Sequence, residues 1–181
     1  MKILYILPLV WMLVFTSCNS DFLDREPSNK YTDDILLTST EGGMMLLNGT
    51  LRRTYINYES HAQYGQKAVD IMTDMLGEDY YTGDGYWNNY ESWYSWLAHR
   101  SANDEDNKFV WMYYYGTIDN MNLLLAHVDA MKGEQKERDN LKGQAYAFRA
   151  HSYFKLVQLY AERYKPEGRN TQLGIPVYTH P

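Results

Sequence analysis

Residues 139–160 form a proline-free run whose bulky side chains recur at the spacing of a helix. One row along this run comprises Leu141, Ala145, Phe148, Ser152, Leu156 and Leu159, and the row beside it comprises Arg149, Tyr153, Val157 and Tyr160. An apolar arc of that width is typical of a helix that packs against other helices. Gly143 lies within the run. Because glycine in a helix costs about 1 kcal/mol relative to alanine, we expect a neighbouring backbone to pass close to it.

Two shorter helices are predicted ahead of this run. The first opens with the capping box Thr38–Glu41. The side chains expected on its buried face are Met44, Leu47, Leu51 and Tyr55. The second begins near Ser60 and stops at Gly77. Its expected buried side chains are Tyr64, Ala68, Ile71 or Met72, and Met75.

A third helix leads into the run. The acidic residues 103–106 form its first turn, where they favour the helix dipole, and the helix closes at Lys132–Gly133. Its expected buried row is Trp111, Tyr115, Ile118, Asn122 and Leu125. The polar residues 134–138 then connect it to the run as an antiparallel helix pair. Asn122 and Arg149 lie on or beside apolar faces, and we expect both to have structural roles, because buried polar groups usually satisfy nearby carbonyls or carboxylates.

Three stretches of the chain together resemble the SusD/RagB family of outer-membrane nutrient-capturing lipoproteins. They are the run from Gly143 and Ala145 through Arg149-Ala150, Tyr153-Phe154, Leu156-Val157 and Leu159-Tyr160 to Gly174-Ile175-Pro176-Val177, the pattern of Trp111, Tyr115, Ile118 and Asn122, and the start Cys18-x-x-Asp21-Phe22-Leu23-Asp24 with Pro27. The resemblance implies an all-α fold of tetratricopeptide-like helical hairpins with an extended N-terminal strap. It also implies a TonB-dependent, SusC-like barrel as the partner that imports the captured ligand.

The N-terminus has the order of a lipoprotein signal. Lys2 precedes the apolar run Ile3–Phe15, which is too short to span a bilayer as a mature helix, and small residues then lead to Cys18. We therefore expect residues 1–17 to be a signal peptide and Cys18 to carry the lipid that attaches the protein to the cell outer membrane. The family resemblance implies that the anchored protein is exposed at the cell surface. An ordinary secretory signal with an incidental cysteine is the alternative. Residues 18–37 read as the extended strap and residues 38–181 as the helical domain.

Composition excludes some classes of function. The formal net charge is −6 and no basic stripe is present, which argues against a nucleic-acid partner. The chain has one cysteine, so an internal disulfide is excluded. The five histidines are scattered without metal-ligand spacing, and no acidic pair is identifiable as catalytic. We expect no catalytic residue, no metal and no cofactor.

The segment 78–96 is the chemically distinctive part of the sequence. It is rich in tyrosine and tryptophan, with amide and carboxylate side chains between them, and such a combination suits a sugar-binding surface. Trp87, Asn88 and Tyr94 are the candidate ligand-binding residues. The alternative is that the aromatics are core, because Tyr86, Tyr90, Trp93 and Leu97 have helical spacing, and we assign that row to the core.

The sequence therefore predicts a surface lipoprotein that captures an oligosaccharide, or a peptide, for import by its barrel partner. Two alternatives from other classes remain open: a membrane-tethered glycoside hydrolase, and a tetratricopeptide-type adaptor that binds only proteins. In the family that this chain resembles, the segment around Gly174 and Pro176 leads into a much longer C-terminal part. We therefore expect the chain to correspond to the N-terminal portion of a longer relative.

Overall fold

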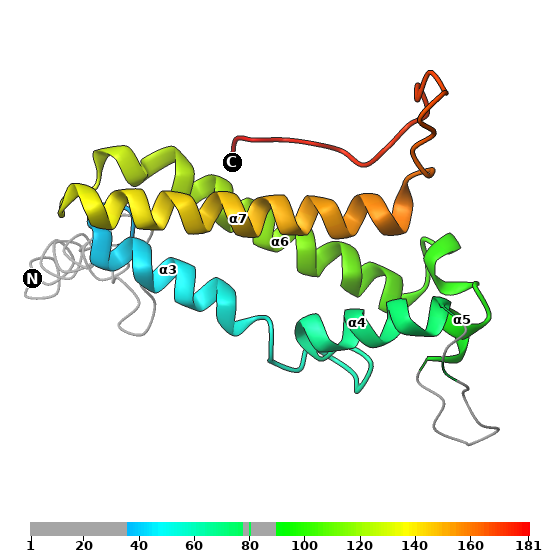
Figure 1. The fold of residues 1–181 in the computed structure, drawn as a ribbon. Helices are drawn as coiled ribbons and strands as arrows, with labels where there is room; N and C mark the ends of the chain where they lie inside the picture. Colours follow the sequence, from blue (N-terminus) through cyan, green and yellow to red (C-terminus); the bar gives the residue numbers. More distant parts are fainter. Residues whose placement is uncertain (1–35, 78–79, 81–89) are drawn as a thin grey trace, which may run out of the picture. The chain divides into compact units, whose positions relative to one another are not determined.

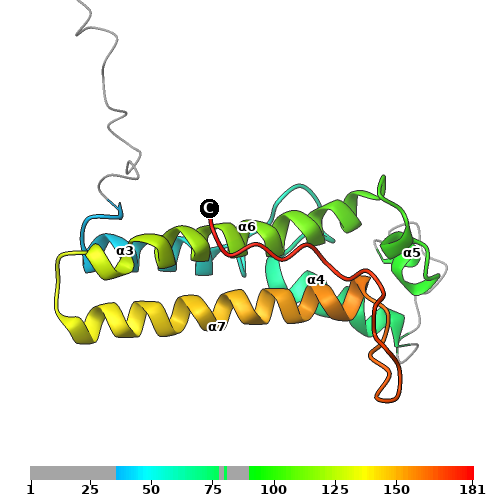
Figure 2. The same ribbon diagram turned by 90° about the horizontal axis from the view of Figure 1, so that it is seen from above.

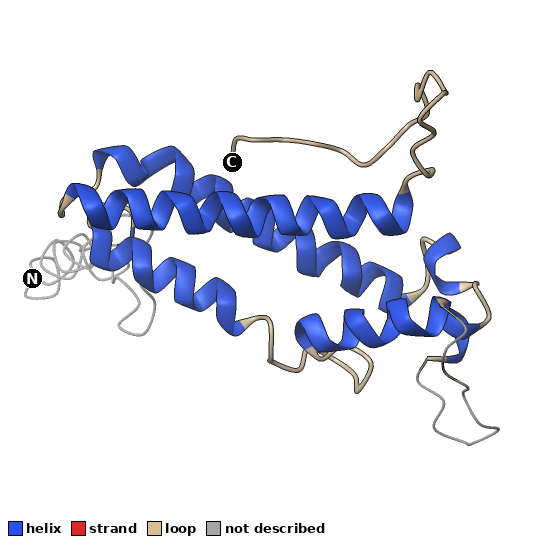
Figure 3. Cartoon of the chain, viewed as in Figure 1, coloured by secondary structure: helices blue, strands red, loops and turns tan. Residues whose placement is uncertain are grey.

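The computed structural model describes residues 36–77, 80 and 90–181, and all of them belong to one compact unit, Thr32–Pro181. In chain order the helices are α3 (Thr40–Arg52), α4 (Gly65–Leu76), α5 (Glu91–Tyr94), η3 (Ala98–Arg100), α6 (Glu105–His127), η4 (Val128–Ala130) and α7 (Gln135–Tyr160). Figures 1 and 3 show that these ranges contain helices and loops but no strand, and the only β-type pairings there are the isolated bridges Ser39–Lys132 and Asn57–Tyr64. The all-α fold class predicted from the sequence is confirmed.

The two longest helices, α6 and α7, form the expected antiparallel hairpin and lie side by side in both ribbon views (Figures 1 and 2). Of the two rows predicted along α7, the first is confirmed, whereas the second contains Val157, which is 41% exposed. Leu141, Ala145, Ser152 and Leu156 are buried, and Phe148 and Leu159 are partly buried. The helix begins at Gln135, earlier than the predicted Asp139, because Glu134 and Glu137 make a capping box that fixes its first turn.

Apolar side chains gather in two clusters along this hairpin. One cluster joins α4 and α5 to the first half of α6 and the last part of α7, and its fully buried members include Met72, Trp93, Val110, Ile118 and Leu156. The other joins α3 and η4 to the second half of α6 and the first part of α7, and it comprises Leu47, Met121, Leu124, Val128, Met131, Leu141 and Ala145. The hairpin is therefore the element that both clusters share.

The start of α3 differs from the prediction. The N-cap is Ser39, whose hydroxyl accepts from the Gly42 N–H at 3.2 Å, so the predicted capping box at Thr38 is wrong. Backbone pairing sets this start, since the Thr40 N–H donates to the Lys132 carbonyl at 2.8 Å and the Lys132 N–H donates to Thr38 at 2.9 Å. Leu47 is buried as predicted, but Tyr55 is 63% exposed because the helix ends before it, at Arg52.

The helix α4 begins at Gly65, not near Ser60. Gly65 has a φ of +56°, and the Gln66 N–H donates to the Thr54 carbonyl at 3.0 Å, so the chain turns sharply just before the helix. Ala68 and Met72 are buried as predicted, Tyr64 is exposed, and Gly77 is the C-cap.

The expectation for Gly143 is wrong. A Cβ added there would have no described atom within 4 Å, apart from its own helix backbone and chain neighbours. The glycine that packs closely is Gly43 on α3, where a Cβ would lie 3.0 Å from both Leu141 Cδ1 and Met131 Sδ and 3.3 Å from Leu124 Cδ1. The close approach therefore occurs where α3 crosses the hairpin.

The residues after α7 turn back and run in an extended path along the hairpin (Figure 2). The Tyr115 hydroxyl donates to the Pro176 carbonyl at 2.9 Å, and the Tyr153 hydroxyl donates to the Tyr178 carbonyl at 2.5 Å. The Tyr178 N–H in turn donates to the Tyr153 hydroxyl at 3.0 Å. These bonds all involve main-chain atoms of the extended segment, so the hairpin holds it through its backbone.

Asn122 and Arg149 belong to the same arrangement. Arg149 donates to the Asn122 side-chain carbonyl at 2.8 Å, and the Asn122 amide donates to the Tyr178 carbonyl at 3.2 Å. Asn122 is buried. Both side chains therefore have the structural partners expected of them, and together they help to hold the extended segment.

Candidate functional site

The residues predicted for ligand binding fall in the least described part of the chain. Trp87 and Asn88, like Cys18, lie outside the described residues. Tyr94 is the last residue of α5 and is partly buried. The structure therefore places one of the three predicted ligand-binding residues.

Of the helical row predicted through this segment, Tyr86 lies outside the described residues, Tyr90 is partly buried, and the other two members differ in burial. Trp93 is 0% exposed, which confirms its assignment to the core. Leu97 is 64% exposed, so its assignment is wrong. The reason is that α5 ends at Tyr94, and Trp96 then takes a φ of +59°, which breaks the helical register before Leu97.

A hollow opens directly after this segment, between η3, the first half of α6 and the end of α7. Its volume is about 550 Å³, within the usual range for a small-molecule site. The residues that line it are His99, Arg100, Ala102, Asn107, Lys108, Trp111, Met112 and Tyr160. We call this site the aromatic hollow.

Trp111 is held in the aromatic hollow by a series of ring contacts. Its ring is stacked on Tyr115, with centroids 5.1 Å apart and planes 10° apart, and it contacts Tyr160 with centroids 4.8 Å apart. Tyr115 stacks in turn on Tyr178, at 5.8 Å and 11°. Tyr115 is desolvated in this series, and burial together with the nearby Tyr153 and Tyr178 raises its pKa to about 12. Trp111 is thus a fixed aromatic surface and not a freely rotating side chain.

Asn107 links the elements that surround the hollow through two hydrogen bonds. It is buried, accepts from the Tyr160 hydroxyl at 2.5 Å and donates to the Ser101 carbonyl at 2.8 Å. Burial raises the pKa of the Tyr160 hydroxyl, so it stays protonated and keeps donating. One donor and one acceptor position of the Asn107 amide are thus used within the protein.

His99 brings a buried polar atom to the edge of the hollow. Its ring lies against Trp93 and Trp96, with centroids 6.3 Å and 5.8 Å away. Burial, and secondarily the positive charge of Arg100, lower the pKa of His99, so its ring is neutral near pH 7. Within the described part of the chain, His99 Nδ1 and Trp93 Nε1 are both buried without a hydrogen-bond partner.

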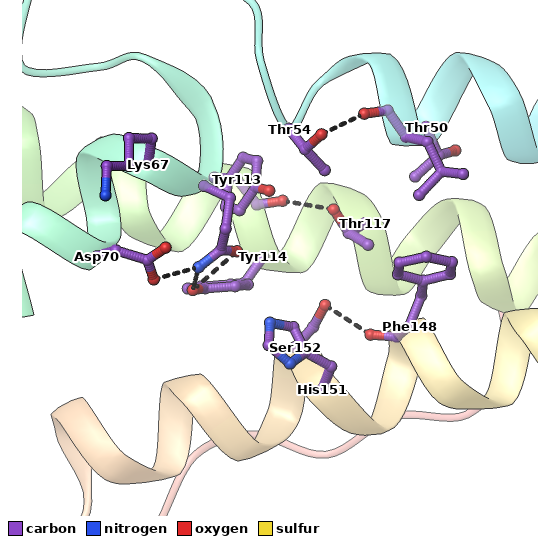
Figure 4. A pocket seen from close by; sticks show the side chains of 12 residues that line it. Thr50, Thr54, Lys67, Asp70, Tyr113, Tyr114, Thr117, Phe148, His151 and Ser152 are labelled. Atoms are coloured by element: carbon purple, nitrogen blue, oxygen red, sulfur yellow. Dashed lines mark hydrogen bonds between the residues drawn. The ribbon is translucent and has the colours of Figure 1, made fainter.

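A second cavity, of about 370 Å³, lies where α3, α4, α6 and α7 come together (Figure 4). Its polar groups mostly bind one another. The Gln66 amide donates to Asp70 at 2.9 Å and to the Tyr114 hydroxyl at 3.1 Å, and Lys155 lies 3.5 Å from Asp70. The Thr117 and Ser152 hydroxyls donate to carbonyls of their own helices, as the dashed lines show. This cavity is therefore largely satisfied by the protein itself, and the aromatic hollow is the better candidate for ligand binding.

Neither a metal centre nor a membrane span is found in the described ranges. No group of three or more His, Cys, Asp or Glu side chains within residues 36–77, 80 and 90–181 could hold a metal ion. In the same ranges, no helix is both long enough and apolar enough to cross a membrane.

Sequence reasoning missed the aromatic hollow as a site. Trp111 and Tyr115 were placed on the buried face of their helix, and both are in fact only partly buried. A signal was present in the sequence, because Asn107, Trp111 and Tyr115 follow one another at steps of four and so share one stripe of α6. The contributions of Arg100 and Tyr160 depend on how η3 and α7 pack against that stripe.

The fold and the site together define an all-α helical-hairpin protein with an aromatic surface site. A family model described as "Starch-binding associating with outer membrane", a SusD-like family, matches residues 21–181. The chain belongs to this SusD-like family, which confirms the family resemblance found in the sequence. No match was found among curated proteins.

A solved structure shares the fold. It is the crystal structure of a SusD-like carbohydrate binding protein from Bacteroides vulgatus, with a TM-score of 0.66 and 24% sequence identity. The match covers 79% of this chain and 29% of that chain. The present chain thus spans less than a third of the length of this relative.

Proposed function

We propose that this chain is the helical part of a cell-surface lipoprotein that binds an oligosaccharide and holds it for import by a TonB-dependent, SusC-like transporter. Residues 1–17 would direct export, Cys18 would carry the lipid, and residues 18–37 would lead from the anchor to the helical domain 38–181. Family membership over residues 21–181 supports this proposal, as does the carbohydrate-binding description of the related crystal structure.

The observation that carries the proposal is the fixed position of Trp111 in the aromatic hollow. A flat ring whose orientation is set by stacking on Tyr115 can receive the C–H face of a sugar ring without losing conformational entropy. The polar side chains around it provide donors for sugar hydroxyls. Capture, and not bond cleavage, is the activity we propose for this arrangement.

The test is calorimetric titration of the full chain with oligosaccharides, beginning with starch-derived ones. Trp111→Ala should weaken binding by about tenfold or more, equivalent to at least about 1.4 kcal/mol. Trp111→Phe keeps a flat ring and should retain most of the affinity. Unchanged affinity in Trp111→Ala would exclude the aromatic hollow as the site, and steady release of shorter sugars during the titration would favour the hydrolase alternative.

The same titration tests the candidate residues of the segment 78–96. If Trp87 is a stacking surface, Trp87→Ala should weaken glycan binding and change the free energy of unfolding by no more than about 0.5 kcal/mol. Trp93→Ala is the matched control, because Trp93 is fully buried and its removal should destabilise the protein by about 3–5 kcal/mol. Equal destabilisation by both changes would mean that Trp87 is a core residue.

A further inference from the structure

We infer that the aromatic hollow selects saccharides that carry a carboxylate, such as oligomers of uronic acids, over neutral saccharides of the same length. This inference rests on the proposed function, because it names the class of ligand for the same site. It follows from which lining groups remain able to bind a ligand.

Among the described residues, the hollow is lined by basic side chains and by no acidic one. The basic residues are His99, Arg100 and Lys108. His99 is neutral near pH 7, and the Lys108 ammonium lies 2.6 Å from the Glu105 carboxylate, so among the lining residues only Arg100 has a positive charge that no described partner offsets. The charge that a ligand can use in the hollow is therefore mainly that of Arg100.

Arg100 is the side chain most available to a ligand. Arg100 ends η3 and is exposed, and its guanidinium makes no hydrogen bond or ion pair with any described residue. Its backbone N–H donates to the Leu97 carbonyl at 3.2 Å. The guanidinium group presents its donors in a planar fork that matches the two oxygens of a carboxylate. A sugar hydroxyl cannot use that fork in the same two-point manner.

Lys108 is less available than Arg100. Its ammonium group lies 2.6 Å from Glu105, and both side chains are largely exposed. Such a pair is weak and is screened by salt, so Lys108 can add to the attraction without dominating it. Arg100 is therefore the residue on which the selection depends.

Two neutral lining groups that could bind a sugar hydroxyl, Asn107 and Tyr160, are bonded to each other, whereas His99 Nδ1 has no partner among the described residues. The Asn107 side-chain N–H donates to the Ser101 carbonyl, and its side-chain oxygen accepts from the Tyr160 hydroxyl. Trp111 and Met112 supply apolar surface, which contacts the C–H face of acidic and neutral sugars alike. The difference between the two kinds of sugar thus falls on the cationic side chains.

The experiment compares two ligands of equal length on the full chain, oligogalacturonates and neutral galacto-oligosaccharides. We expect the acidic oligomer to bind about tenfold tighter or more at low salt, and this preference to shrink as ionic strength rises from about 50 to 500 mM. Arg100→Gln should lower the affinity for the acidic oligomer far more than that for the neutral oligomer, and so remove most of the preference, while leaving the melting temperature unchanged. Arg100→Lys should restore part of it.

Lys136→Gln is the matched control. It removes one positive charge from the exposed first turn of α7, whereas the hollow is lined by Tyr160 at the other end of that helix, so the preference should be unchanged. Equal binding of the two oligomers, or an unchanged preference in Arg100→Gln, would overturn the inference and leave the proposed function standing. Failure of both oligomers and of starch-derived sugars to bind would instead overturn the proposed function.

Discussion

Three glycines of this chain occupy sites with very different demands on the backbone. Gly65 has a φ of +56°, and a Cβ there would lie 2.2 Å from the Thr54 carbonyl oxygen. Gly43 sits against flexible side-chain ends, whereas Gly143 is exposed on α7 with open space around it. The same residue type therefore marks a turn, a helix crossing and an ordinary helical surface.

Gly143→Ala should raise the free energy of unfolding by about 0.5–1 kcal/mol, because alanine restricts the unfolded chain and meets nothing in the folded one. Gly65→Ala should lower it by more than about 1 kcal/mol, since both the positive φ and the contact with Thr54 must be relieved. Chemical denaturation of the full chain measures both. A loss of stability in Gly143→Ala would mean that a partner covers this face of α7.

Whether a single side chain is buried was predictable from the sequence where helical periodicity alone decides it. Leu141, Leu156 and Trp93 were assigned to the core from spacing and are all fully buried. Tyr55 and Leu97 were misassigned because each lies just beyond the end of its helix, where spacing no longer sets direction. Gly143 was misinterpreted because a sequence does not show what stands opposite a helical position.

At the level of elements, one row of side chains on α7 is not buried equally along its length. Leu141 is fully buried against α3 and η4, whereas Phe148 is only partly buried and lines the cavity shared with α3 and α4. The two side chains lie on the same predicted row. Their energetic contributions should nevertheless differ.

Leu141→Ala should cost about 2–5 kcal/mol, the range for a fully buried leucine. Phe148→Ala should cost less than the about 3–5 kcal/mol of a fully packed phenylalanine, because part of the ring already faces the cavity. Thermal and chemical unfolding of the two variants make the comparison. A cost at Phe148 equal to or above the upper end of that range would place its ring fully inside the core.

The extended segment depends on Tyr153, whose hydroxyl bonds to both main-chain polar groups of Tyr178. Tyr153→Phe removes these bonds, each of which is worth about 0.5–1.5 kcal/mol. Hydrogen exchange at the Tyr178 amide should therefore speed up. Tyr146→Phe is the control, because Tyr146 is on the same helix, is 48% exposed, and makes no hydrogen bond through its hydroxyl with any described residue. Equal acceleration in both variants would contradict the role of Tyr153.

The elements themselves were largely predictable, but their docking was not. The capping residues and apolar spacing of α6 and α7 are local signals, and both helices were expected. The path of the extended segment was not, because its bonds use main-chain carbonyls and an N–H, groups that nearly every residue possesses. The aromatic hollow was missed for a related reason, since it forms only when η3 and the end of α7 meet α6.

At the level of the whole molecule, the proposed site and the proposed anchor lie far apart in the sequence. Cys18 precedes the helical domain, whereas the lining of the hollow runs from His99 to Tyr160. The proposed anchor and the proposed site can therefore be tested separately. Ligand affinity should depend on the hollow and membrane attachment on Cys18.

Cys18→Ala should release the protein from the membrane fraction and abolish labelling by a palmitate analogue, because the thiol is the proposed point of acylation. Fractionation and metabolic labelling of cells expressing the full chain measure these two effects. Sugar binding by the released protein should equal that of the parent. Unchanged fractionation together with unchanged labelling would contradict lipid attachment at this residue.

The hydrogen bonds of the extended segment also determine how the molecule would carry a mechanical load. A pull applied at Tyr178 would pass through Tyr153 and Asn122 into the middle of α7 and α6, and not through the end of α7 at Tyr160. Residues 161–173 would stay slack until those bonds failed. While those bonds hold, the load would enter the hairpin at the middle of α7 and α6, where the two helices are packed together, and not at the end of α7.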